Sequence, residues 1–200
     1  MQINKDKLAR IISTVFVPPS FSIIVFTLLA FYLETESTQR YITIFVALIF
    51  GFISPIVLFV YYRKKGKIID LDASIKEERT VPMSISVIFF TVGLIMFIAF
   101  DLNIVSIAYW FCYISNTLIA IIINKNWKIS AHTMGAAGPL AAVTFLFGPI
   151  ALVFLIIVVL VGWSRIQLKC HSIGEVIAGG IFAFISTYIQ IYLIVSYFCT

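Results

Sequence analysis

The sequence predicts an all-α protein of the polytopic membrane class, with about six or seven membrane helices that form a single domain over residues 1–200. Hydrophobic residues make up 62% of the 200 positions, and charged residues make up only 12%. The mean hydropathy is +1.09. Because a soluble domain usually carries about 25% charged residues, this composition excludes the soluble class and indicates a transmembrane helical bundle.

The first expected helix covers residues 16–33. Basic residues precede it, as they do in a signal peptide, but no small-residue cleavage site follows, so we expect the helix to be retained. Pro18 and Pro19 fall in its first turn, where proline is tolerated. A short acidic turn then leads into a second expected helix over residues 41–62.

The polar stretch 63–80 is mixed in charge and is expected to lie outside the bilayer. Further single helices are expected over residues 82–100, 104–123 and 172–197. The apolar run 130–163 is too long for one crossing at about 1.5 Å per residue. We expect it to form two short helices joined at Gly148 and Pro149, because this breaker pair divides the run most evenly.

The positions of the basic residues agree with seven crossings. With that number, Arg40 is the only one of the 14 Lys and Arg residues on its side of the membrane, and the positive-inside rule makes the other side cytoplasmic. An undivided helix over 130–163 would move Arg165 and Lys169 to the side of Arg40, so the bias favours the divided run. We read the net charge of +5 as loop topology and attraction to anionic lipid heads, not as nucleic-acid binding.

A polar segment separates the last two apolar runs, and Arg165, Lys169, His171 and Glu175 fall within it. If a helix begins near His171, that residue and Glu175 stand at positions i and i+4 and can touch. A carboxylate that orients a histidine is one half of a catalytic pair. The alternative is a basic loop beside the membrane with a glutamate that only caps a helix. Both interpretations remain open at this point.

Two further polar clusters, residues 72–79 and 128–132, are expected on the same membrane face. The chain has only two histidines, His132 and His171, and both lie at expected helix starts. Helix N-termini carry unpaired N–H groups that favour an anion. Histidines, arginines and lysines that gather at one membrane face indicate phosphoryl transfer, with histidine as nucleophile or acid and arginines around the anion.

No residue pattern indicates a metal site. The three cysteines lack the spacing of metal ligands, and we expect them to be free thiols; they are Cys112, Cys170 and Cys199. Asp70 and Asp72 could suggest a magnesium-binding prenyl-transfer motif, but no second aspartate pair accompanies them. We therefore expect neither a metal nor another cofactor.

The segment from Ser164 to Glu175 matches a block of a known family: Ser-Arg, five residues, His, and three residues before a carboxylate. The chain resembles the phosphatidic acid phosphatase type 2 superfamily, whose members are integral-membrane lipid phosphate phosphatases. That family has aspartate at the position of Glu175. Its Pro-Ser-Gly-His block is matched by residues 129–132, which keep Ser130 and His132.

The remaining block of the family is Lys, six residues, Arg-Pro. Arg79 matches its arginine, but Asp72 stands at the position of the lysine, and Pro82 comes three residues after the arginine instead of directly after it. Lys76 and Lys128 are the two candidates to supply the missing positive charge.

The resemblance implies a role for each matched residue. His171 would be the nucleophile that forms a phosphohistidine, and Glu175 would hold its ring. His132 would protonate the leaving alkoxide and then deprotonate the attacking water. The phosphoryl oxygens would be held by Arg79, Arg165, Ser130 and either Lys128 or Lys76.

We therefore expect a metal-independent phosphatase for a lipid phosphate or diphosphate, of the phosphatidate, phosphatidylglycerophosphate or polyprenyl phosphate type. Its site would lie at the cytoplasmic membrane–water boundary, and its partners would be the lipid substrate and the surrounding membrane lipids. Two alternatives remain: a phosphotransferase of the same family with an alcohol acceptor, and an inactive lipid-binding membrane protein. The sequence does not indicate an oligomeric state.

Overall fold

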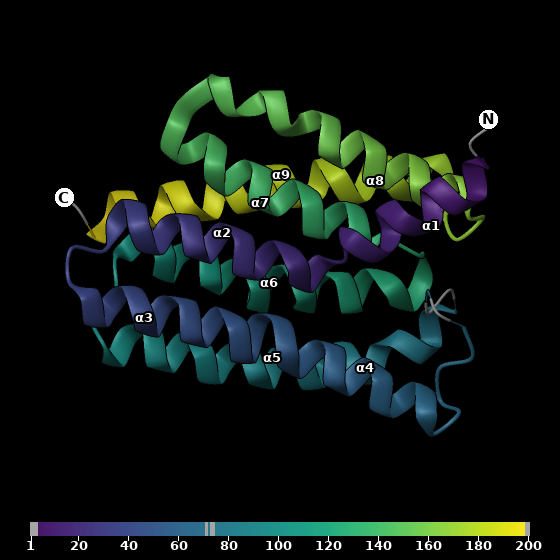
Figure 1. The fold of residues 1–200 in the computed structure, drawn as a ribbon, viewed down its shortest axis with the longest axis horizontal. Coiled ribbons are helices and arrows are strands. Elements are labelled where there is room, and N and C mark those ends of the chain that lie inside the picture. Colours follow the sequence, from purple (N-terminus) through teal and green to yellow (C-terminus); the bar gives the residue numbers. More distant parts are fainter. Residues whose placement is uncertain (1–3, 71, 73–74, 199–200) are drawn as a thin grey trace.

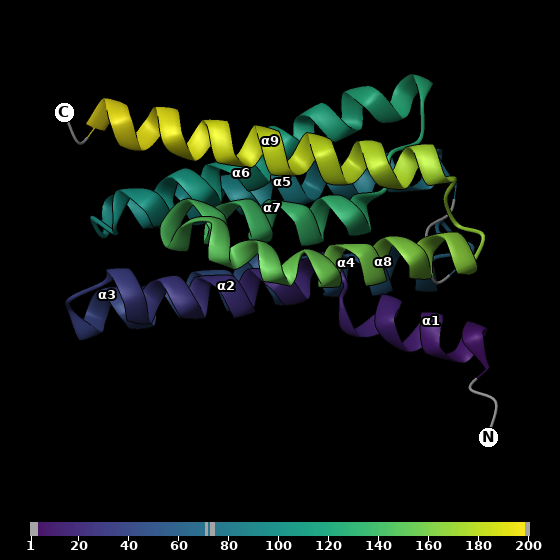
Figure 2. The ribbon, with the colours of Figure 1, turned by 90° about the horizontal axis from the view of Figure 1, so that it is seen from above.

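The computed structural model describes residues 4–70, 72 and 75–198, and these residues form helices without any strand. The all-α class is thus confirmed. The helices lie roughly parallel or antiparallel to one another in one elongated bundle (Figures 1 and 2). Their bounds are α1 Lys5–Val15, α2 Pro18–Leu33, α3 Ser37–Val46, α4 Ser54–Lys64, α5 Lys76–Ala99, α6 Ile104–Asn126, α7 Ala131–Phe147, α8 Leu155–Gln167 and α9 Ile173–Phe198. A π-helical segment, Ala47–Ile53, joins α3 to α4, and a 3₁₀ segment, Gly148–Phe154, joins α7 to α8.

Five helical runs in the described part of the chain are long and apolar enough to cross a membrane. They are Ser37–Lys64, Lys76–Ala99, Ile104–Asn126, Ala131–Gln167 and Ile173–Phe198. The number rises to six if α1 and α2, which meet at a bend of 50°, form one span. The protein is therefore a helical membrane protein, as its composition predicts.

The run Ala131–Gln167 folds back on itself. Gly148 adopts a φ of +71°, a conformation that suits glycine, and ends α7. Figure 1 shows α7 and α8 side by side in opposite directions. A Cβ added to Gly162 in α8 would lie 3.5 Å from Cγ2 of Thr133 in α7, so the end of one helix meets the start of the other. The predicted division at Gly148 and Pro149 is confirmed.

Three helix starts differ from the sequence-based expectation, and the simplest is α3, which begins at Ser37, four residues before the expected start at Tyr41. Residues 5–15 form a separate helix, α1, because Asn4 caps its start and Val17 is extended before Pro18. Helix α5 begins at Lys76, six residues before the expected start at Pro82. Glu77 and Glu78 stabilise its first turn through the helix dipole, and Pro82 lies inside the helix without ending it.

An aromatic core holds the helices of the bundle together. The Trp110 ring of α6 is fully buried, and its Nε1 donates to the carbonyl of Phe90 at 2.7 Å. Its centroid lies 5.0 Å from that of Phe26 in α2. Gly93 of α5 permits this packing, since a Cβ there would lie 2.4 Å from Cζ2 of Trp110. This core fixes α2, α5 and α6 relative to one another.

Polar side chains link α6 to α9 inside the apolar interior. Asn116 Nδ2 donates to Thr187 Oγ1 at 3.0 Å, and its Oδ1 accepts from Ser186 and Gln190. Such bonds between membrane helices stabilise their association. Of the predicted free thiols, Cys112 and Cys170 are free and buried, and Cys199 lies outside the described residues.

The three polar clusters meet at one end of the bundle. Helix α1, the α4–α5 connection, the α6–α7 connection and the α8–α9 loop all lie at the end marked by the N-terminus (Figures 1 and 2). The α2–α3 and α5–α6 turns lie at the opposite end with the C-terminus. The expected gathering of the polar clusters on one face is thus present.

Candidate active site

His171 lies just before α9 and contacts Glu175 in the first turn of that helix. Its Nδ1 is 2.6 Å from Glu175 Oε2. The same carboxylate accepts from the backbone N–H of Ser172 at 3.4 Å, while Ser172 Oγ accepts from the N–H of Glu175 at 3.3 Å. This reciprocal pair is a capping box. Glu175 therefore caps the helix and contacts the histidine at once, so the expected contact and the expected cap are both present.

The surroundings of His171 favour its neutral form. Burial is the main influence that lowers the pKa of His171 below its ordinary value, and the charges of Lys128, Arg79 and Arg165 lower it further, while the Glu175 hydrogen bond opposes them. A neutral imidazole can bond to a carboxylate only by donating, so Nδ1 carries the proton. Nε2 then keeps its lone pair, as a nucleophile requires.

The start of α7 lies beside the start of α9. Ser130 caps α7 by accepting from the N–H of Thr133 at 3.4 Å, and its own N–H donates to the carbonyl of Glu175 at 3.3 Å. A Cβ at Gly179 would come within 2.9 Å of the Ser130 carbonyl oxygen, so glycine permits this close approach. His132 is in the first turn of α7. Two helix N-termini, both favourable to an anion, thus meet here.

Two buried arginines come from α5 and α8. Arg165 is 0% exposed and Arg79 is 8% exposed. Each guanidinium uses Nη1 for protein contacts: that of Arg165 donates to Ser13 and Asp72, and that of Arg79 donates weakly to the Ile129 carbonyl at 3.5 Å. Within the described residues, Nε and Nη2 of both arginines are buried without an acceptor.

These unpaired nitrogens are unusual because a buried donor without a partner costs about 1–3 kcal/mol, and more when it is charged. Nε and Nη2 form the side-on fork of a guanidinium, which matches two oxygens of a carboxylate or a phosphate. Two such forks at one membrane face indicate an anion-binding site.

The two candidate lysines behave differently. Lys128 donates its ammonium protons to the carbonyl of Cys170, next to His171. Burial lowers the pKa of Lys128, and the charge of nearby Arg79 lowers it further. Lys76 instead donates to the carbonyl of Lys125 at 3.0 Å, near the end of α6. The structure thus places Lys128 near the predicted phosphate-binding residues Arg79 and Arg165, while Lys76 bonds to the end of α6.

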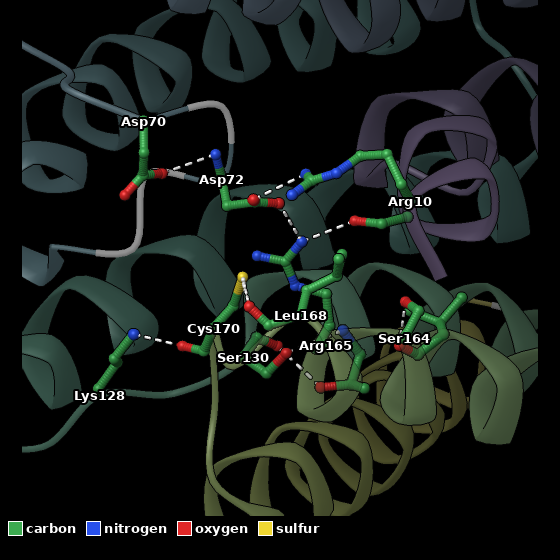
Figure 3. A network of polar contacts seen from close by, with 12 residues as sticks. Arg10, Asp70, Asp72, Lys128, Ser130, Ser164, Arg165, Leu168 and Cys170 are labelled. Carbon is green, nitrogen blue, oxygen red and sulfur yellow. Dashed lines mark hydrogen bonds and ion pairs between the residues drawn. The ribbon is translucent and has the colours of Figure 1, made fainter. Parts of the chain in front are cut away.

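Asp72, which stands where the resembled family has lysine, lies between the side chains of Arg10 and Arg165 (Figure 3). Its Oδ1 lies 2.5 Å from Arg165 Nη1, and its Oδ2 lies 2.7 Å from Arg10 Nη1. Burial alone would raise the pKa of Asp72, but hydrogen bonds and charges from Arg165 and Arg10 outweigh it and lower the pKa. The residue at the position where the resembled family has lysine is therefore an ionised carboxylate bound to Arg165.

Sequence reasoning missed Arg10 and Ser13, which join this network from α1. Ser13 Oγ accepts from Arg165 Nη1 at 2.6 Å, and Ser13 is 3% exposed. The available signal was their spacing of three residues, which places both side chains on one face of a helix.

The two aspartates of the alternative magnesium motif make other contacts. Both carboxylate oxygens of Asp72 accept from arginines, and Asp70 Oδ1 accepts from the backbone N–H of Asp72.

An apolar groove of about 670 Å³ runs between α7, α8 and α9. Its lining includes Leu140, Val158, Ile166, Ile181 and Phe184. Thr133 and Val176 also line it, and they directly follow His132 and Glu175 in the chain. The groove therefore reaches from the polar residues into the apolar part of the bundle.

The chain was compared with protein-family models, with curated proteins and with solved structures. None of these comparisons gave a match.

Proposed function

We propose that the protein is a lipid phosphate phosphatase of the phosphatidic acid phosphatase type 2 superfamily, acting through a phosphohistidine on His171. The observation that carries the proposal is the pair of buried, unpaired guanidinium forks on Arg79 and Arg165. They lie at the same end of the bundle as His171, whose Nδ1 is bound by Glu175. In the proposal its other ring nitrogen, Nε2, is the nucleophile.

The proposed reaction has two steps. In the first, His171 Nε2 forms a bond to phosphorus while the bond to the lipid oxygen breaks, and His132 gives a proton to the leaving alkoxide. In the second, His132 takes a proton from water, the resulting hydroxide attacks phosphorus, and the P–N bond breaks to release inorganic phosphate. The arginine forks and Lys128 would stabilise the charge on the phosphoryl oxygens, where each well-placed donor contributes about 3–4 kcal/mol.

The apolar groove supports a lipid substrate. A hydrocarbon chain lying between α7, α8 and α9 would bring its head group to the residues that begin α7 and α9. Val159 and Ile181 of the groove are 56% exposed on the outside of the bundle, so a hydrocarbon chain can enter from the surrounding bilayer.

The bias of lysine and arginine toward this end of the bundle supports a cytoplasmic site.

A panel of detergent-solubilised lipid phosphates and diphosphates tests the proposal, with inorganic phosphate as the readout. We expect release from at least one lipid phosphate, and we expect a chelator to leave the rate unchanged. An added alcohol that suppresses phosphate release and yields a new phospholipid would identify a phosphotransferase. No release from any lipid, together with no labelling by radioactive phosphate, would favour the inactive lipid-binding alternative.

The same assay determines the side of the site when it is run in sealed membrane vesicles. A short-chain lipid phosphate that does not cross the bilayer should be hydrolysed by inside-out vesicles and spared by right-side-out ones. The reverse pattern would place the site on the outer face and contradict the assignment from the charge bias.

Replacing Glu175 by glutamine should lower kcat/KM by about 10²-fold or more at pH 7, because the imidazole loses its orienting acceptor. The acid limb of the pH profile should move as well. The Glu175 hydrogen bond raises the pKa of His171, so its loss lowers that pKa and shifts the limb to lower pH. The measurement is kcat/KM from about pH 3 to pH 8, a range that includes the pKa of His171, which is lowered to about 4 in the wild type.

Glu175→Asp is the matched control, since it keeps the charge and matches the residue of the resembled family. It should keep the acid limb of the wild type and recover most of the rate. An acid limb that moves to higher pH in Glu175→Gln would contradict the proposed pairing.

A further inference from the structure

The guanidinium of Arg165 is divided into a bound edge and a free edge. Nη1 donates to two acceptors, Ser13 Oγ at 2.6 Å and Asp72 Oδ1 at 2.5 Å. The Nε–Nη2 fork is buried and has no acceptor among the residues that the structure describes. Two acceptors on one terminal nitrogen fix the plane of the guanidinium, and the direction of the fork follows from that plane.

Asp72 is itself held firmly. Its second oxygen accepts from Arg10 Nη1 at 2.7 Å, and its backbone N–H donates to Asp70 Oδ1 at 2.7 Å. The Asp72 side chain is only 9% exposed. A rotation of the carboxylate would therefore break a contact with a buried or half-buried arginine.

Helix α1 supplies the other half of this support. Arg10 and Ser13 are three residues apart on that helix, and they contact Asp72 and Arg165 respectively. Gln167 Nε2 in the last turn of α8 also donates to Asp6 Oδ1 at 2.8 Å, so α1 is fastened along the end of α8. The Nε–Nη2 edge of Arg165 can therefore bind an anion, while Ser13 of α1 and Asp72 bind Nη1.

We infer that Asp72 is a positioning residue that, with Ser13 and Arg10 of α1, holds the Arg165 fork toward the phosphoryl group. The inference rests on the proposed phosphatase function. It gives a reason for an acidic residue where the resembled family has lysine: a carboxylate at this place acts through Arg165 instead of touching the substrate. It also makes α1 a part of the site.

A competing account predicts the opposite effect of neutralising Asp72 on anion binding. If Asp72 only competed with phosphate for Arg165, its neutralisation would tighten anion binding. If Asp72 positions Arg165, the same change releases the guanidinium and weakens binding. The effect of one substitution on vanadate inhibition therefore separates the two accounts, because vanadate is a phosphate-like anion that needs no lipid chain.

The experiment measures KM and kcat for a lipid phosphate, and the inhibition constant of vanadate, in the full-length protein. Asp72→Asn should weaken vanadate inhibition tenfold or more, and Ser13→Ala should weaken it by a smaller factor because Asp72 still holds Nη1. Asp72→Glu should restore part of the loss, since it keeps a carboxylate. Glu36→Gln is the control: it also removes one carboxylate charge, from an exposed position in the α2–α3 turn at the opposite end of the bundle, and should change inhibition less than twofold.

A double substitution tests whether Asp72 acts through Arg165. Arg165→Lys keeps the charge but has no fork to position. In that background Asp72→Asn should have less than a twofold further effect on vanadate inhibition, although it has a tenfold effect alone. Equal effects in both backgrounds would show a general structural role and overturn the inference, as would tighter inhibition in Asp72→Asn.

The result also distinguishes this inference from the function on which it rests. A wild type that releases no phosphate from any lipid phosphate and binds no vanadate refutes the phosphatase proposal. An active wild type with an equally active and equally inhibited Asp72→Asn refutes only the positioning role. Thermal unfolding of each variant in detergent identifies a protein that fails to fold, and for Asp72→Asn the partly restored Asp72→Glu then provides the comparison.

Discussion

Replacing His171 by alanine is expected to lower the release of inorganic phosphate by about 10⁴-fold or more, because the variant lacks the atom that would bond to phosphorus. The loss should fall on kcat, since the arginine forks that would bind the anion remain. The Nδ1 contact with Glu175 disappears too, but Glu175 keeps its bond to the Ser172 N–H, so α9 keeps its cap. Radioactive phosphate should label the wild type in acid-labile form and should not label the variant.

Lys169→Asn is the matched control in the same loop. Lys169 is exposed and has a φ of +56°, a conformation that asparagine tolerates well. Its rate should stay within twofold of the wild type. Unchanged turnover in His171→Ala would exclude the phosphohistidine mechanism.

Replacing Arg165 by leucine should have the second largest effect, in activity and in stability together. The variant loses both donors of one fork, and we expect kcat/KM to fall by about 10³-fold. It also leaves the buried Asp72 carboxylate with Arg10 as its remaining arginine partner. Breaking a buried pair on one side typically costs about 3–5 kcal/mol, so the unfolding temperature in detergent should fall clearly.

Arg165→Lys separates the two effects. A lysine can still pair with Asp72, so most of the stability should return, but it cannot offer two parallel N–H groups to a phosphate, so activity should remain low. Arg63→Leu removes an exposed arginine at the same end of the bundle and should change neither quantity. Full activity in Arg165→Leu would contradict the proposed phosphate site.

The sequence predicted the fold well where local chemistry decides it. Long apolar runs define membrane helices, and Gly148 before Pro149 divides the one run that is too long. The start of α5 was predicted six residues too late, because Pro82 was taken as a first-turn proline. The helix begins at Lys76 instead, where the negative charges of Glu77 and Glu78 interact favourably with the positive end of the helix dipole. Helix α1 was missed because its apolar residues merge with those of the next helix in the sequence.

The site was predictable to a similar degree. The spacing of four residues between His171 and Glu175 sufficed to predict their contact. The contacts of Arg165 with Asp72 and Ser13 join residues that are 93 and 152 positions apart. No local sequence pattern predicts these contacts, because they depend on how the helices pack. For the same reason the sequence could not choose between Lys76 and Lys128.

The contact between Ser13 and Arg165 also constrains how the protein is made. The two residues are separated by 152 positions, so at about 5–20 residues per second the ribosome reaches the second about 8–30 seconds after making the first. During that interval α1 has no α8 to dock on. Leu8, Ile11 and Val15 of α1 remain at least 39% exposed in the folded bundle. An amphipathic helix of this kind can bind in the headgroup layer of the membrane until α8 has been made. Completion of the site is therefore expected to be a late event in biogenesis, after the hairpin of α7 and α8 has inserted.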